Sequence, residues 1–180
     1  MTIKTLLLSG AVALASMVLV AIYPAMKRLT FWPQLILGLA FNWGALVGYA
    51  SVTERLSSAA VSLYLGGVAW TLVYDTIYAM QDQRDDAIVG VRSTARRFAG
   101  APRRWLALFA TVSLLLWGLC GFLGRLHPAF LAGLLLVGLH FAWQVGTLKP
   151  DAPADCLAKF RSNAHVGWLL LIAIAAGRAA

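Results

Sequence analysis

Six stretches of apolar residues, each long enough to cross a lipid bilayer, constrain this 180-residue chain more than any other feature. They lie at residues 5–23, 34–52, 60–78, 105–123, 129–147 and 164–180. The hydrocarbon core of a bilayer is about 30 Å thick, and a helix crosses it with about 20 apolar residues. Hydrophobic residues make up 61% of the chain and charged residues only 12%, which leaves little material for a water-soluble module. We therefore expect an all-α bundle of six membrane helices that forms a single domain over residues 1–180.

Prolines and small residues support these boundaries. Small residues within the apolar stretches, as in "LGLAFNWGALVGYA", favour close contact between helices in lipid. Prolines are expected at or between the helix edges, where a missing amide hydrogen costs least: Pro24, Pro33, Pro102, Pro128 and Pro150.

The N-terminus allows two interpretations. The stretch "MTIKTLLLSGAVALASM" has features of a cleaved signal peptide, but the apolar run continues to residue 23, which favours a retained membrane helix.

Basic residues lie mainly on one side of the predicted bundle. Six helices place the loops 24–33, 79–104 and 148–163 together, and these loops hold eleven lysines and arginines against four elsewhere. Cytoplasmic loops of membrane proteins are enriched in such residues. We therefore predict that loop 79–104 faces the cytoplasm. The net charge of +8 largely reflects this bias, and no nucleic-acid partner is expected.

Four of the seven acidic residues lie in "YDTIYAMQDQRDD", residues 74–86, directly after an apolar stretch. If this segment continues as a helix, Asp82 and Asp86 lie within about 20° of Asp75, and Asp85 lies about 80° away. Carboxylates that share a face repel one another, and their hard oxygens suit Mg²⁺, which commonly bridges carboxylates to a substrate phosphate. We predict a functional acid at Asp75 and a magnesium site at Asp82 and Asp86. The alternative is a solvated helix end that pairs with Arg84 and Arg92.

A basic pair, Lys27 and Arg28 in "YPAMKRLT", lies on the same predicted side of the membrane. One interpretation is a positive anchor that only sets the topology. The other is an anion clamp, because arginine and lysine both bind phosphate. Carboxylates for Mg²⁺ and cations for phosphate, at the mouth of an apolar bundle, together suggest a diphosphate attached to an apolar group.

Several motifs resemble those of the UbiA-type membrane prenyltransferases, in order along nearly the whole chain. They are "YPAMKRLTFWPQLILGLAFNWG", "YDTIYAMQDQRDD", "GVRSTARRFAG" and "SNAHVG". The resemblance implies a bundle of nine membrane helices with a cytoplasmic cap. It also implies Mg²⁺-dependent transfer of a polyprenyl group from a polyprenyl diphosphate to an aromatic acid, 4-hydroxybenzoate, in ubiquinone synthesis. The expected location is the inner membrane of a bacterium.

The resemblance also implies roles for individual residues. Asp82 and Asp86 match the DxxxD pair of the family's second Asp-rich motif, and Asp75 matches the acid that precedes it. The remaining residues are expected to hold the diphosphate (Lys27, Arg28 and Arg92) or to line the substrate (Tyr78 and Asn42).

The family's first Asp-rich motif has no counterpart in this sequence, which matches the last six of the nine helices. The chain is therefore interpreted as a C-terminal fragment, a sequence with a wrongly assigned start, or one half of a split enzyme with a separate N-terminal half. Little activity is expected of the chain alone. The alternative function is an inactive remnant or a cation-binding membrane protein, although carboxylates gathered at one membrane edge favour the enzyme. The segment "DAPAD" (Asp151 and Asp155) is a weak second metal candidate, because Pro153 opposes a helix there and the loop is expected to be solvated.

Overall fold

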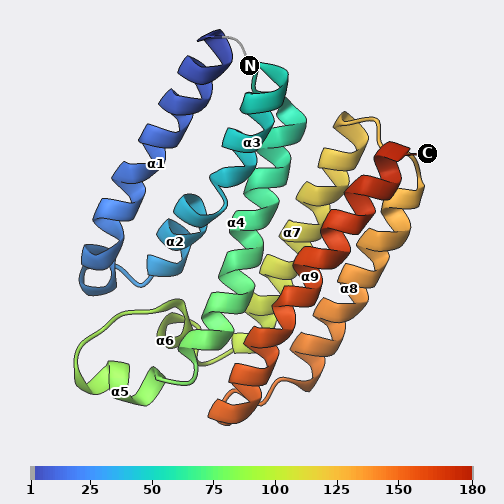
Figure 1. Ribbon diagram of the computed structural model, residues 1–180. Coiled ribbons are helices and arrows are strands. Elements are labelled where there is room, and N and C mark those ends of the chain that lie inside the picture. The colour runs from blue at the N-terminus through green and yellow to red at the C-terminus, as the bar shows by residue number, and fades with distance from the viewer. Residues whose placement is uncertain (1–2, 180) are drawn as a thin grey trace.

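The computed structural model describes residues 3–179, with side chains from residue 10 onward, and this part of the chain is helical without strands (Figure 1). The predicted all-α fold is therefore confirmed. In chain order the helices are α1 (Ile3–Leu29), α2 (Pro33–Phe41), α3 (Gly44–Thr53), α4 (Ser58–Ala79), α5 (Gln83–Ile88), α6 (Thr94–Arg97), α7 (Pro102–Leu123), α8 (Ala129–Thr147) and α9 (Pro153–Ala179).

Five segments are long and apolar enough to cross a membrane. They are Gly10–Leu29, Pro33–Thr53, Ser58–Ala79, Pro102–Leu123 and Ala129–Thr147. The sixth predicted span, 164–180, forms the second half of α9 up to Ala179, and its last residue lies outside the described residues. This helix is not among the five. It begins well before residue 164, and polar residues such as Asn163 and His165 dilute its apolar character.

Two prolines take positions that differ from those expected. Pro24 lies inside α1, which runs on to Leu29, so the predicted helix end at residue 23 is wrong. Pro153 begins α9, so it does not oppose a helix at "DAPAD", because a proline at the first helical position loses no intrahelical hydrogen bond. Asp155 lies in that first turn, and its Oδ2 accepts a hydrogen bond from the backbone N–H of Lys149 at 2.8 Å.

The second predicted helix is interrupted at Asn42, which ends α2 before α3 begins. The Asn42 side chain donates from Nδ2 to the carbonyl of Gly38 at 2.9 Å and to Thr71 Oγ1 of α4 at 2.8 Å. Asparagine competes with helical hydrogen bonding in this way. The Asn42 side chain also lies so close to Gly67 that a Cβ there would overlap it. Asn42 therefore joins α2 to the middle of α4.

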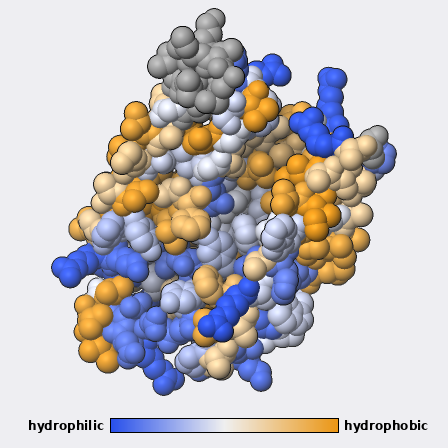
Figure 2. All heavy atoms as spheres, viewed as in Figure 1, coloured by the Kyte–Doolittle hydropathy of each residue, from blue (hydrophilic) through white to orange (hydrophobic). Residues whose placement is uncertain are grey.

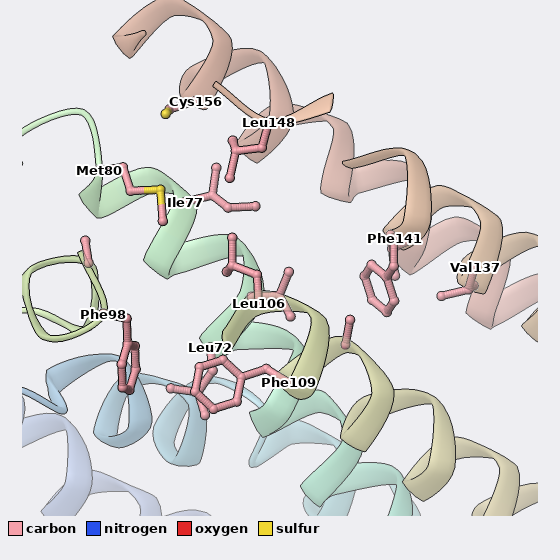
Figure 3. Packing of buried hydrophobic residues seen from close by; sticks show 14 of the residues in the cluster. Leu72, Ile77, Met80, Phe98, Leu106, Phe109, Val137, Phe141, Leu148 and Cys156 are labelled. Atoms are coloured by element: carbon pink, nitrogen blue, oxygen red, sulfur yellow. The ribbon is translucent and has the colours of Figure 1, made fainter. Parts of the chain in front are cut away.

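Helix α4 lies at the centre of the bundle and packs against α2, α3, α6, α7 and α9 (Figure 1). The main core cluster includes Leu72 and Ile77 of α4 together with Phe109 of α7 and Phe141 of α8 (Figure 3). A Cβ at Gly66 would overlap the indole of Trp117, so this glycine permits the close approach of α7. Because α4 is packed between its neighbours at the centre of the bundle, the position of its C-terminal end, which carries Asp75, is fixed.

The loops predicted to lie together do so. The C-terminal end of α1, the segment with α5 and α6, and the turn between α8 and α9 are at the lower end of the bundle in Figure 1. The face in Figure 2 is mostly hydrophilic around this end, where α5 and α6 lie, with a hydrophobic group at its left edge. The predicted cytoplasmic orientation of this end stays a prediction.

Candidate functional site

The acidic segment is not the continuous helix that its spacing suggested. Helix α4 ends at Ala79, the chain bends, and a new helix, α5, begins at Gln83. Gln81 contributes to this ending, because its backbone N–H and its side-chain Nε2 both donate to the carbonyl of Tyr78 at 3.1 Å. The assumption of one helix over residues 75–86 is therefore wrong, and Asp75 and Asp82 belong to different elements.

Three of the four carboxylates nevertheless line one small cavity of about 140 Å³ at this end of the bundle. Asp75 comes from the last turns of α4, Asp82 from the bend, and Asp86 from α5. The backbone N–H of Asp86 donates to the carbonyl of Asp82 at 2.8 Å, which keeps these two residues on adjacent turns. Asp85 does not line the cavity and is exposed, as the helical spacing predicted.

Two cations line the same cavity. Its lining contains Lys27 from the last turn of α1 and Arg92 from the loop before α6. Tyr78 also lines the cavity, and its ring centroid lies 4.7 Å from that of Phe160 in α9. The structure therefore brings together six of the eight predicted site residues: Lys27, Asp75, Tyr78, Asp82, Asp86 and Arg92.

The other two predicted residues lie elsewhere. Arg28 follows Lys27 on α1, is exposed, and does not line the cavity, because adjacent residues on a helix point about 100° apart. The Asn42 side chain is hydrogen-bonded to Gly38 and Thr71 and packs against Gly67. It does not line the cavity either. Lys27 therefore lines the cavity and Arg28 does not, and the contacts of Asn42 indicate a packing role.

The loop that carries Arg92 lies against the C-terminal end of α1. Gly90 has a φ of +75°, a left-handed conformation that favours glycine. The backbone N–H of Arg92 then donates to the carbonyl of Lys27, and its guanidinium donates to the carbonyl of Leu29, both at 2.8 Å. The guanidinium also lies 5.4 Å from the centroid of the Phe31 ring. Arg92 therefore helps to cap α1 and contributes charge to the cavity wall.

The electrostatics of Asp86 reflect a site crowded with carboxylates. Burial is the main cause that raises the pKa of the Asp86 carboxyl above its ordinary value, and repulsion by Asp82 adds to it. Lys27 and Arg96 oppose this rise. Arg96 also donates from its guanidinium to the carbonyls of Val91 and Asp86, which ties α6 to the end of α5. A cation between Asp82 and Asp86 would relieve their repulsion.

The carboxylates present fit a magnesium ion that also binds a substrate. Among the residues with described side chains, no group of three His, Cys, Asp or Glu side chains forms a complete metal cage. Magnesium does not require one, because it keeps several waters and is held by one or two carboxylates plus substrate phosphates. Asp82 and Asp86 could supply that pair of carboxylates.

Three further polar residues of the cavity wall were not singled out from the sequence: Tyr23, Gln34 and Ser93. Gln34 carried a usable signal, since it is a polar residue in the first turn of an apolar helix. Ser93 caps α6 by accepting a hydrogen bond from the backbone N–H of Arg96. Tyr23 precedes Lys27 by one helical turn, so the two residues share a face of α1.

Comparisons with known proteins identify the family to which the chain is similar. The sequence profile of the UbiA prenyltransferase family matches residues 3–175. The mitochondrial 4-hydroxybenzoate polyprenyltransferase of Bos taurus is 44% identical over 170 residues, which are 94% of this chain and 46% of the bovine protein. The enzyme of the same name from Arabidopsis thaliana is 45% identical over 94% of this chain and 42% of its own length.

The human enzyme of that name is 43% identical over 94% of this chain. The chain spans about half the length of the curated relatives it matches. No solved structure is detectably similar. The family profile covers nearly all of the chain and includes every residue of the cavity. The chain belongs to the UbiA prenyltransferase family.

Proposed function

We propose that this chain takes part in the transfer of a polyprenyl group from a polyprenyl diphosphate to 4-hydroxybenzoate, a step of ubiquinone biosynthesis. One observation carries the proposal: Asp75, Asp82 and Asp86 share a cavity with Lys27 and Arg92 at the end of an apolar bundle. Family membership and the names of the curated relatives support the same activity.

The cavity suits the two ends of such a substrate. Lys27 and Arg92 would bind the diphosphate oxygens, since charge-assisted hydrogen bonds to phosphate are among the stronger polar contacts. The prenyl chain would extend from the cavity toward the apolar helices, where no polar group has to be desolvated. The end of α4 would then place the allylic carbon at the boundary between charged and apolar surroundings.

The reaction breaks the bond between the allylic carbon and the diphosphate oxygen, and the diphosphate leaves with the electron pair. A ring carbon of 4-hydroxybenzoate attacks the resulting carbocation, and the ring then loses a proton. Lys27 and Arg92 would stabilise the charge that develops on the leaving group. Asp75, a carboxylate at the inner part of the site, would stabilise the positive charge on the prenyl carbon.

Magnesium is part of the proposal. Asp82 and Asp86 would hold the ion, which when bound neutralises negative charge on the departing diphosphate. Tyr78, whose ring packs on Phe160, would border the aromatic acceptor. We place the chain in the inner membrane of a bacterium, with this cavity on the cytoplasmic side, in contact with membrane lipid.

The test is an assay of prenylated 4-hydroxybenzoate in membranes that lack the endogenous enzyme. The chain is expressed alone and also together with the N-terminal region of the bovine relative, with Mg²⁺ and a prenyl diphosphate. We expect little product from the chain alone and a prenylated product when the N-terminal region is present, and this product should disappear in Asp82→Asn and Asp86→Asn. The matched control is Asp151→Asn, an exposed aspartate outside the cavity. No product in either arrangement, or product that is indifferent to all three changes, would contradict the proposal.

A further inference from the structure

We infer that Gln34 binds the diphosphate, by donating a hydrogen bond from its side-chain Nε2 to a phosphate oxygen at the N-terminus of α2. The inference rests on the proposed function and adds a neutral donor to the cationic part of the cavity. Gln34 lines the cavity beside Pro33, the first residue of α2.

The orientation of the Gln34 amide follows from its one hydrogen bond to the protein. The backbone N–H of Thr94 donates to Gln34 Oε1 at 3.1 Å. Only the oxygen of the amide can accept, so the NH₂ group must occupy the other position. Gln34 is only 4% exposed, and its Nε2 makes no hydrogen bond to any other residue that the structure describes. Because Gln34 borders the cavity, this donor is available to a ligand that brings an acceptor.

The surroundings of Gln34 indicate that this acceptor is anionic. Helix α2 begins at Pro33, and its preceding residue, Trp32, provides no side-chain cap. A helix N-terminus carries a partial positive charge and favours phosphate groups. Lys27 and Arg92 line the same cavity. Donors from three different segments therefore line the same cavity as the carboxylates of α4, the bend and α5.

The presence of both donors and carboxylates in one wall favours diphosphate over the aromatic acid as the partner of Gln34. A single carboxylate could be bound by the donors alone and would leave Asp82 and Asp86 without a function. A diphosphate can accept from the donors and, through Mg²⁺, also contact the carboxylates. A diphosphate carries the larger charge, so it can interact with both the donors and the carboxylates of the cavity wall.

Gln34 is held in place by a buried polar connection between three helices. Thr94, which donates to Gln34, also shares a hydrogen bond of 2.6 Å between its hydroxyl and that of Thr76 in α4. Thr76 and Thr94 are 1% and 0% exposed. This connection fixes the Gln34 side chain before any ligand arrives, and pre-organised donors bind with less loss of side-chain freedom. Thr76 does not line the cavity, so it offers a control for the connection alone.

The experiment measures binding of inorganic pyrophosphate with Mg²⁺ to the full chain in lipid nanodiscs by calorimetry. Gln34→Glu keeps an acceptor for Thr94 but loses the donor. Gln34→Met loses the donor without adding charge. Thr76→Val breaks the connection but leaves the cavity wall intact. Thermal unfolding of each variant monitors folding. We expect both Gln34 variants to weaken pyrophosphate binding about tenfold, the effect typical of one hydrogen bond to a charged group. Thr76→Val loosens the Gln34 side chain but keeps its donor, so it should weaken binding by much less.

Each other outcome overturns the inference. If Thr76→Val weakens pyrophosphate binding as much as Gln34→Met does, Gln34 acts only through the packing of the loop. If binding of 4-hydroxybenzoate is weakened instead, Gln34 contacts the acceptor. If the wild-type chain binds pyrophosphate and the Gln34 variants bind it equally well, the inference fails while the proposed function stands. If the wild-type chain does not bind pyrophosphate at all, both fail.

Discussion

The backbone N–H of Arg92 donates a hydrogen bond of 2.8 Å to the carbonyl of Lys27. This bond joins the last turn of α1 to the loop before α6, so the two cations of the cavity are held together although they are far apart in the sequence. A backbone hydrogen bond of this kind does not depend on the side chains, so either cation can be replaced without breaking it.

Substitutions of Lys27 and Arg28 should therefore differ in their effect on binding of a prenyl diphosphate. Lys27→Ala removes a cation from the cavity wall, and binding of a prenyl diphosphate should weaken about tenfold. Arg28→Ala, at an exposed position outside the cavity, should change binding little. Titration calorimetry with a prenyl diphosphate and, separately, with 4-hydroxybenzoate checks this prediction. Equal losses in the two variants would mean that both act through topology or general surface charge.

Substitutions of the clustered aspartates should also differ in their effect on prenyl transfer. Asp82→Ala and Asp86→Ala should each lower prenyl transfer by of order a hundredfold, the size typical when one group that stabilises developing charge is removed. Asp85→Ala should cost much less, because Asp85 does not line the cavity. Steady-state kinetics of the three variants measure the difference. A loss in Asp85→Ala as large as the others would show that the cavity assignment is wrong.

Magnesium binding should weaken in acid because of Asp86. Its pKa is raised by burial and by Asp82, so a proton competes with the metal at a pH above the ordinary aspartate range. As the pH falls through the raised pKa, the affinity for Mg²⁺ should fall. Calorimetric titration with Mg²⁺ over a series of pH values tests this, with Asp151→Asn as a control that should keep the wild-type profile. A profile that stays flat in this range would contradict it.

The same raised pKa predicts an effect on stability without metal. The folded chain holds this proton more tightly than the unfolded chain does, so the free energy of unfolding falls as the pH rises from the ordinary aspartate pKa through the raised value. Asp86→Asn removes the charge and should raise the unfolding temperature at neutral pH when Mg²⁺ is absent. Thermal unfolding in detergent measures this, and a decrease would mean that the Asp86 carboxylate is stabilised in the fold.

Asn42 should prove to be a packing residue. Asn42→Ala removes its hydrogen bonds to Thr71 and Gly38 and should lower the free energy of unfolding by about 1 kcal/mol, as for other hydrogen bonds between membrane helices. The apparent binding constants for the prenyl diphosphate and for 4-hydroxybenzoate should not change. A selective effect on either substrate would instead support the substrate contact that the sequence suggested.

Hydropathy predicted the apolar helices because the length of a membrane segment is set by the bilayer, which acts on every segment alike. It could not predict the interruption at Asn42, because that depends on Thr71 and Gly67 of another helix. The grouping of Asp75, Asp82 and Asp86 was predicted correctly from an incorrect helix. The bend after Ala79 and the turn of α5 return the last two carboxylates to the same side.

Residues that reach the cavity from distant segments were harder to predict. The motifs around Lys27 and Arg92 indicated charge, but the hydrogen bond that joins them is made by the backbone, which carries no sequence signal. Gln34 was missed because its burial and its contact with Thr94 depend on tertiary packing.

The most direct test of the central claim is the Mg²⁺ dependence of diphosphate binding at this cavity. An unreactive analogue, geranyl thiodiphosphate, is titrated into the chain in nanodiscs with Mg²⁺ or with a chelator. We predict saturable binding that requires Mg²⁺ and is lost in Asp82→Asn and Asp86→Asn. Binding that is equally tight with the chelator, or unchanged in both variants, would contradict the claim that these carboxylates and the cations of the same cavity form one diphosphate site.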